Sequence, residues 1–318
     1  MTLPPIDRPG TVRELDRVPS LMALYAKALT PDPADVARLG ARILPDALRP
    51  KQRTATIDDR HRSLPDVALK VRGVTANPQG LREYQNLLGF PRTEDLPAGY
   101  VHVLAFPVAM AVMAAPDFPL PLAGMVHLEN RVDVDRTLTV GETFTVTAWA
   151  SNLSGHLKGT RVDLIVEVSD PEGVVWRGVS TYLAKGTYTH GRGNDTGAAR
   201  EFTPPLPTGS WSLGAGIGRE YAAVSGDRNP IHLSALTAKA FGFPRAIAHG
   251  MYTAARALAD ARPLHGERYS WTVEFAKPVL LPEKVAVAIT PHNAGGASYV
   301  GWNSKTGKLH FSGEISPL

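Results

Sequence analysis

Two apolar helix candidates, each followed by a set of alternating strands, constrain the fold more than any other feature of this sequence. VAMAVMAA, residues 108–115, precedes the first strand set, and MYTAARALA, residues 251–259, precedes the second. The order of elements repeats with an offset of roughly 140 residues, which is much longer than the repeat of a solenoid. The pattern therefore predicts an internal duplication.

Alternation with a period of two identifies the strands. In RVDLIVEVSD, residues 161–170, apolar side chains point to one face and charged side chains to the other. The apolar positions are Val162, Leu164, Val166 and Val168, and the charged ones are Arg161, Asp163 and Glu167. The other strand candidates are residues 144–151, 174–184, 269–280, 285–290, 297–303 and 308–315.

These elements predict an α+β fold in which a curved antiparallel sheet wraps around one long helix, twice. Two unrelated α+β domains are the alternative that the pattern leaves open. An additional segment, ELDRVPSLMALYAKAL at residues 14–29, precedes the first lobe. Its helical spacing at Leu21, Leu24, Tyr25 and Leu29 indicates a helix that packs against that lobe.

Residues 187–210 are rich in Gly, Thr and Pro and have no sustained apolar period, which is typical of a linker. We expect an N-terminal lobe with its helical extension at 1–190, a linker at 191–208 and a C-terminal lobe at 209–318. A chain of 318 residues exceeds the usual size of one hydrophobic core, so two lobes are consistent with its length.

Several classes of protein are disfavoured by composition. The N-terminus has neither the basic start nor the apolar run of a signal peptide. The most apolar stretch, residues 100–115, contains His102 and Pro107 and is shorter than the roughly 20 residues of a membrane span, so we expect a buried helix there. Cysteine is absent, which excludes disulfides, thiolate metal sites and a Cys nucleophile and favours a cytoplasmic location.

The net charge of +4 fits two interpretations equally well. It favours an anionic partner, such as a phosphorylated cofactor or an acidic carrier protein, and it also fits a slightly basic enzyme surface. The dense Lys/Arg stripe with interleaved aromatic residues that is typical of nucleic-acid binding does not occur, so we expect no nucleic-acid partner.

Polar residues concentrate in YAAVSGDRNPIHLSALTAKAFGFPRAIAHGM, residues 221–251. Pro230 biases the preceding residue away from helical backbone angles, so Asp227 and His232 are expected on a bend instead of on one helix face. Ser234 is a candidate cap for a helix in ALTAKAF. A second helix is expected to begin near residues 249–250.

Each of these residues alone has an ordinary structural explanation. Asp227 is suited to an Asx turn, and the Asn229-Pro230 pair is common turn chemistry. His232 alone is more often a hydrogen-bonded structural residue than a catalyst. Together, however, an acid and a His across a stiff bend, followed by Gly250 at a helix N-terminus, provide two proton-transfer groups and an anion hole.

SGDRNPIH, followed by GFPRAIAHGM, resembles the hydratase motif of the MaoC-like, (R)-specific enoyl-CoA hydratases, which are hot-dog folds. The two-lobed length is similar to the double hot-dog members, which include bacterial (3R)-hydroxyacyl-thioester dehydratases. The resemblance implies reversible hydration of trans-2-enoyl thioesters to (3R)-3-hydroxyacyl thioesters in fatty-acid synthesis or degradation. It implies an acyl-CoA or an acyl carrier protein thioester as substrate. We expect no cofactor or metal.

The resemblance also implies roles for individual residues. Asp227 and His232 correspond to the catalytic acid and His, Asn229 to a residue that orients the site, and Gly250 to the donor of the oxyanion-hole N–H. Ser225, His249 and Met251 are candidate substrate-binding residues.

The first lobe departs from the family pattern. Its comparable fragment is Ala76-Asn77-Pro78-Gln79-Gly80, in which Thr75 takes the place of the acid and Gly80 that of the His. Neither residue supports acid–base chemistry, so we expect one active site per chain, with the first lobe shaping an acyl tunnel. Two lobes are compatible with a monomeric pseudo-dimer and with a homodimer.

Other functions fit the sequence less well. A hot-dog acyl-thioesterase is the nearest enzymatic alternative, and a non-catalytic acyl-binding protein is the second. GAGIG at 214–218 lacks the G-x-G-x-x-G spacing of dinucleotide-binding folds, and the surroundings of Ser225 lack the G-x-S-x-G of serine hydrolases. No HExxH motif or comparable cluster predicts a metal site.

Overall fold

The computed structural model describes residues 6–29, 63–122, 124–191, 193, 202–261, 264 and 266–318. The elements of the first lobe are β1 (Thr11–Leu15), α1 (Leu21–Leu29), β2 (Val67–Thr75), α3 (Pro78–Leu88), β3 (Asp95–Leu96), α4 (Ala98–Met113), β4 (Met125–Val134), β5 (Leu138–Thr139), β6 (Thr143–His156), β7 (Gly159–Ser169) and β8 (Val174–Lys185). Those of the second lobe are β9 (Gly209–Leu213), α5 (Ile217–Ser225), α6 (Pro230–Leu233), α7 (Ala235–Ala240), α8 (Gly250–Ala261), β10 (Tyr269–Phe275), β11 (Glu283–Pro291), β12 (Ala297–Asn303) and β13 (Leu309–Pro317).

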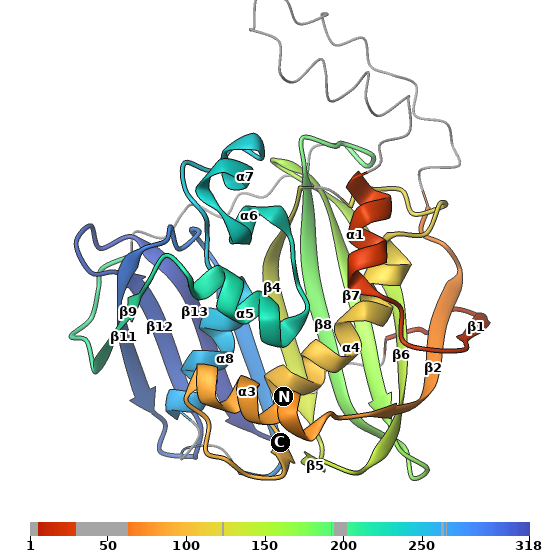
Figure 1. Ribbon diagram of the computed structural model, residues 1–318, viewed down its shortest axis with the longest axis horizontal. Coiled ribbons are helices and arrows are strands. Elements are labelled where there is room, and N and C mark those ends of the chain that lie inside the picture. The colour runs from red at the N-terminus through yellow and green to blue at the C-terminus, as the bar shows by residue number, and fades with distance from the viewer. Residues whose placement is uncertain are drawn as a thin grey trace, which may run out of the picture.

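The large sheet confirms the predicted duplication. Its eleven strands follow the order β1-β2-β6-β7-β8-β4-β10-β13-β12-β11-β9, which is symmetric about the β4–β10 junction once β1 is set aside. At that junction the two strands pair antiparallel, with Trp271 opposite Val132. Each half-sheet curves around one helix, α4 or α8, as Figure 1 shows. The fold is therefore the expected double hot-dog, an α+β architecture.

The two central helices approach each other at small residues. Gly99 of α4 has no side chain, and a Cβ atom there would lie 3.1 Å from the Cβ of Ala255 in α8. Both helices are surrounded by one cluster of buried apolar side chains that includes strands from both lobes. The core is therefore continuous across the junction.

The predicted faces of β7 are only partly correct. Val162, Leu164, Val166 and Val168 are buried in the main core, as expected. On the opposite face Glu167 is also buried, and it forms ion pairs with Arg8 and with Arg177. The N-terminal residues cover this outer face, where the Arg8 guanidinium lies 5.5 Å from the centre of the Trp149 ring.

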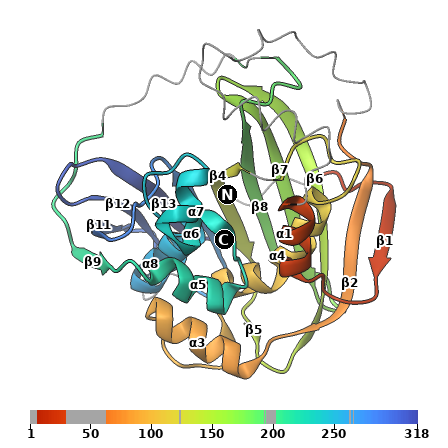
Figure 2. The same ribbon diagram turned by 45° about the horizontal axis from the view of Figure 1, so that its top comes forward.

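The N-terminal segment contains a strand that the sequence did not predict. β1 pairs in parallel with β2 and extends the edge of the first half-sheet, so Glu14 and Leu15 are extended instead of helical. The helix begins only at Leu21, and it packs beside α4, as expected (Figure 2). α1 thereby comes to lie over the inner face of the sheet.

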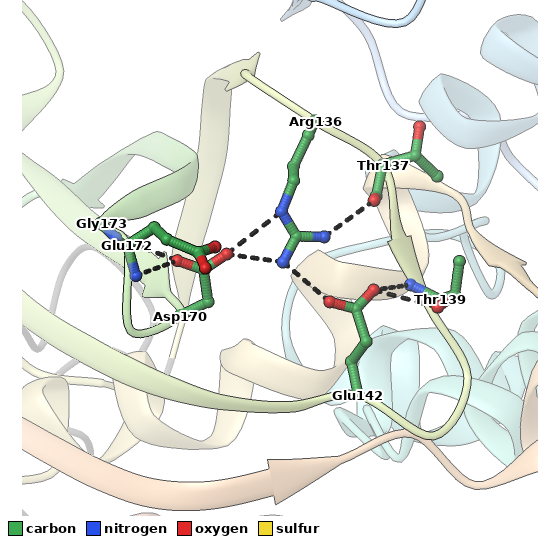
Figure 3. Close-up of polar contacts among 7 residues, drawn as sticks. All are labelled: Arg136, Thr137, Thr139, Glu142, Asp170, Glu172 and Gly173. Carbon is green, nitrogen blue, oxygen red and sulfur yellow. Dashed lines mark hydrogen bonds and ion pairs between the residues drawn. The ribbon is translucent and has the colours of Figure 1, made fainter.

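An ionic network joins three connecting segments at the end of the first half-sheet (Figure 3). Arg136, which follows β4, bonds to Asp170 in the β7–β8 turn and to Glu142 after β5. Hydrogen bonds from this guanidinium hold the pKa of both carboxyl groups below their ordinary values. The network is remote in sequence from residues 221–251, and we assign it a structural role.

Part of the predicted linker, at residue 192 and residues 194–201, lies outside the described residues. The predicted lobe boundaries therefore stay a prediction. Within the described parts of the chain, no helix has the length and apolar character needed to cross a membrane.

Candidate active site

Three short helices carry the polar segment of the second lobe. α5 ends at Ser225, and its cap residue Gly226 has a positive φ of 73°, a backbone conformation that favours glycine. Asn229 caps α6 by accepting a hydrogen bond from the N–H of Ile231, and Pro230 is the first residue of that helix. Ser234 caps α7, as predicted, through the N–H of Thr237. The bend between α5 and α6 therefore has a fixed course.

The first lobe contains the same cap without the acid. Asn77 accepts a hydrogen bond from the N–H of Gly80 and begins α3, whose first residue is Pro78. The Asn-Pro pair thus begins a helix in both lobes. What distinguishes the second lobe is the acid two residues before its Asn and the His three residues after it.

His232 and His249 lie face to face. Their ring centres are 3.6 Å apart, with 24° between the planes, and both residues are buried. His232 comes from the single turn of α6, and His249 immediately precedes α8. The fold thereby brings the two parts of the sequence motif into direct contact.

Hydrogen bonds to carbonyl groups define the tautomers of the two neutral rings. Nδ1 of His232 lies 2.9 Å from the carbonyl oxygen of Ile247, and Nε2 of His249 lies 3.0 Å from that of Asp227. Because a carbonyl oxygen only accepts, both nitrogens carry the proton. His232 therefore keeps an unprotonated Nε2, which can accept a proton.

Asp227 is held through one of its two carboxylate oxygens. Oδ1 accepts a 2.5 Å hydrogen bond from the hydroxyl of Tyr25 and a 3.1 Å bond from the N–H of Asn229. Oδ2 lies 3.8 Å from Nε2 of His249, and the side chain remains 21% exposed. Oδ2 is thus the oxygen that remains available for a ligand.

The surroundings keep both imidazoles neutral. Burial lowers the pKa of His232 to about 3, with a further contribution from His249. Burial likewise lowers the pKa of His249. At neutral pH the site therefore offers unprotonated imidazole nitrogens.

Burial and the neighbouring groups shift the pKa of Asp227 in opposite directions. Burial raises its pKa, whereas the charge that His249 and His232 carry when protonated, together with the hydrogen bonds from Tyr25 and the Asn229 amide, lowers it. The net direction is downward, and the two hydrogen bonds persist when both rings are neutral. Asp227 is accordingly ionised at neutral pH.

The separation of these groups matches the span of one bridging water molecule. One nitrogen of each imidazole and one oxygen of Asp227 lie within 4.8 Å of one another. Two hydrogen bonds of about 2.8 Å span this separation through one water oxygen. The arrangement can therefore bind a water and accept its proton.

The same three side chains form a candidate metal cluster that the sequence did not reveal. Their geometry fits acid–base chemistry better. The stacked rings direct their in-plane lone pairs side by side instead of toward a common point. Two of the ring nitrogens also bond to backbone carbonyl oxygens.

Gly250 begins α8, as predicted. A Cβ atom at this position would lie 2.9 Å from the Phe275 ring, so the close approach of that ring requires a residue without a side chain. Its N–H belongs to the first turn of the helix, where backbone N–H groups have no intrahelical partner. The site thus has a hydrogen-bond donor at the positive end of a helix dipole.

Two other predicted residues are engaged internally. Ser225 is buried, donates to the carbonyl of Tyr221 and accepts from the N–H of Asp227. Met251 is buried in the main core. Their contact with substrate, like that of His249, stays a prediction.

The first lobe contributes more to this site than its sequence suggested. The charge of Asp227 reaches His102 of α4, His127 of β4 and Tyr182 of β8 strongly enough to affect the pKa of each. His127 stacks on Tyr182, with ring centres 4.5 Å apart. No local sequence pattern links these residues to Asp227, because only the sheet topology brings the two lobes together.

Two open hollows of about 520 Å³ each lie elsewhere on the second lobe. One is lined in part by Arg245, Glu283 and Lys284. The carboxylate there already binds His310 and the side chain of Asn303. The convergent acid–base groups around Asp227 therefore make the better candidate site.

Comparisons with known proteins match the second lobe to a protein family. The family model of the MaoC like domain matches residues 195–298. The 3-hydroxyacyl-thioester dehydratase X of Mycobacterium tuberculosis is 33% identical over 253 residues, covering 79% of this chain and 90% of that protein. The 3-hydroxybutyryl-CoA dehydratase of Methylorubrum extorquens is 41% identical over 73 residues, 22% of this chain and 46% of that protein.

Solved structures extend the similarity to both lobes. The crystal structure of HtdX of Mycobacterium tuberculosis superposes with a TM-score of 0.70 at 32% identity, over 79% of this chain and 100% of that one. A MaoC-like dehydratase from Phytophthora capsici superposes with a TM-score of 0.66 at 22% identity, over 82% of this chain and 97% of that one. The second match concerns the fold alone.

Proposed function

The chain belongs to the MaoC-like dehydratase family, and from this membership we propose that it reversibly hydrates trans-2-enoyl thioesters to (3R)-3-hydroxyacyl thioesters. The observation that carries the proposal is the juxtaposition of Asp227, His232 and His249 in one site, with Gly250 next to His249 at the start of α8. We propose Asp227 and His232 as the catalytic residues and Gly250 as the oxyanion donor.

The reaction needs one water and no external oxidant or reductant. In hydration the water oxygen bonds to the β carbon while the Asp227–His232 pair accepts a water proton. The electron pair of the C=C bond moves onto the thioester oxygen as an enolate. The Asp227–His232 pair then returns the proton to the α carbon. The reverse reaction expels water from the 3-hydroxyacyl thioester.

The enolate oxygen requires stabilisation between the two proton transfers. The N–H of Gly250, at the N-terminal end of α8, is oriented by the backbone and is suited to donate to that oxygen. We propose that Asn229 orients the site through its backbone N–H to Asp227 and through its cap of α6.

Several finer assignments belong to the same proposal. The substrate is carried on CoA or on an acyl carrier protein, the pathway is fatty-acid synthesis or degradation, and the location is cytoplasmic. The first lobe shapes the acyl tunnel, and the active unit is a monomeric pseudo-dimer or a homodimer. An activity profile over enoyl chain lengths on both carriers, with the mass measured in solution, tests these assignments.

A direct assay separates this function from its alternatives. The purified protein should remove the absorbance of crotonyl-CoA or of a longer trans-2-enoyl-CoA without releasing free thiol. An (R)-specific 3-hydroxyacyl dehydrogenase should oxidise the product, and an (S)-specific enzyme should not. Release of free CoA would instead indicate a thioesterase, and binding without turnover a non-catalytic acyl-binding protein.

A further inference from the structure

The N-terminal extension reaches the proposed catalytic acid. Tyr25 lies in the middle of α1, and its hydroxyl donates to Oδ1 of Asp227 at 2.5 Å. The two residues are 202 positions apart in sequence. Among the described residues, this contact is the shortest hydrogen bond made to the carboxylate, and nothing in the chemistry proposed above requires it.

Contacts on either side of Tyr25 hold α1 in position. Leu21, one helical turn earlier, is buried, and its Cδ1 would lie 3.2 Å from a Cβ atom on Gly226, the residue before the acid. Lys27, half a turn later, donates to the carbonyl of Ala114 at the end of α4. Since Leu21 and Tyr25 are four residues apart, they share one face of the helix.

The hydroxyl controls which carboxylate oxygen is available. Two donors from separate parts of the chain bond to Oδ1. They are the hydroxyl of Tyr25 on α1 and the backbone amide of Asn229, two residues after the acid. Rotation of the carboxylate would break both bonds, so Oδ2 stays directed toward His249. Without the hydroxyl, only the amide bond would oppose this rotation.

We propose that Tyr25 is a positioning residue, which fixes the carboxylate of Asp227 so that Oδ2 receives the proton of the reacting water. The proposal rests on the proposed function for its catalytic consequence, and on geometry alone for the orientation of the carboxylate. It assigns the N-terminal extension to the active site.

Within the described parts of the chain, seven other titratable groups on separate elements interact electrostatically with Asp227. They are Tyr25 of α1, His102 of α4, His127 of β4, Tyr182 of β8, Tyr221 of α5, His232 of α6 and His249 before α8. Burial raises the pKa of the three tyrosines and lowers that of the four histidines, so all seven are neutral at neutral pH. The charges of these groups therefore stay constant around neutral pH, and a change in the pKa of Asp227 in a Tyr25 variant reports the loss of its hydrogen bond.

Tyr25→Phe removes the hydroxyl and keeps the ring. We expect kcat to fall about 10-fold, the effect of one hydrogen bond to a charged group. KM should change less than two-fold, because the proposed role of Tyr25 acts through Asp227. Carboxyl ¹³C NMR of Asp-labelled protein, assigned with Asp227→Asn, should show the pKa of Asp227 about one unit higher in the variant. The matched control is Tyr188→Phe, which removes a hydroxyl bonded to the Leu157 carbonyl in the β6–β7 turn.

Leu21→Ala provides a second variant that leaves Asp227 and Tyr25 intact. It loosens α1 and should raise the pKa of Asp227 in the same direction, with circular dichroism confirming that the variant is folded. An unchanged Asp227 titration in both variants would overturn the inference. A raised pKa in a protein that hydrates no enoyl thioester would instead support the positioning by Tyr25 and contradict the proposed function.

Discussion

Protonation states decide, at the scale of single residues, what Asp227, His232 and His249 can do. The tautomers follow from two carbonyl partners, and the neutral state follows from burial. An ionised carboxylate beside a neutral imidazole can take a proton from water while the substrate becomes an enolate, and the charge of the pair is restored when the proton is returned to the substrate. This pairing is what the proposed reaction requires in both directions.

The pH dependence of the wild-type enzyme tests these states. Because the pKa of His232 is lowered to about 3 and that of Asp227 is also lowered, the active form predominates above both values. We expect kcat/KM to change less than two-fold between about pH 5.5 and 8. An acidic limb with a midpoint near 6.5, the ordinary pKa of imidazole, would contradict a buried neutral His232.

The sequence predicts which residues form the candidate site better than it predicts their hydrogen-bond partners. The order of Asp227, Asn229, His232 and Gly250 is visible in the sequence, because these residues share one continuous segment. Tyr25 is not visible there as a partner of Asp227. Its spacing with Leu21 marks it only as a packing residue, and the hydrogen bond depends on how α1 docks.

At the scale of elements, a close contact between the short helices α5 and α6 positions His232. Gly218 of α5 lies against the backbone of α6, where a Cβ atom would be 2.0 Å from the carbonyl oxygen of His232. The contact is with backbone, which cannot move aside as a flexible side chain does. The position of the imidazole therefore depends on a glycine with no chemical role.

Gly218→Ala should separate α5 from α6 and displace His232. We expect the rate of hydration to fall about 10-fold or more and the free energy of unfolding to fall by about 1–3 kcal/mol, the usual cost of overpacking. Gly214→Ala is the matched control, since a Cβ atom there meets nothing within 4 Å. Equal activity of the two variants in the enoyl-CoA assay would show that this helix contact does not hold the site.

Most helices and strands were predictable because their apolar periods are strong. β1 was not, since TVREL is exposed at four of its five positions and pairs only at the sheet edge. The buried state of Glu167 was also missed, because it depends on N-terminal residues that cross the outer face of the sheet. Both failures involve contacts between segments far apart in sequence.

Symmetry about the β4–β10 junction organises the whole molecule. The two lobes share strand order, central helix and an Asn-Pro helix start, and they differ in chemistry: Thr75 stands where the second lobe has Asp227. In the first lobe, the charge of Asp227 nevertheless affects the pKa of His102, His127 and Tyr182. The duplication was predictable from the repeat, whereas this contribution required the relative placement of the lobes.

One measurement tests the central claim that Asp227 and His232 act on one water. The hydration rates of Asp227→Asn, His232→Gln and the double variant should be compared with those of Asp117→Asn and His190→Gln, two exposed positions. Each single site variant should lose roughly 10²-fold or more in kcat, and the double variant should be hardly slower than the worse single one, because the two groups act as a unit. Wild-type rates in either single variant, or losses that multiply in the double variant, would contradict it.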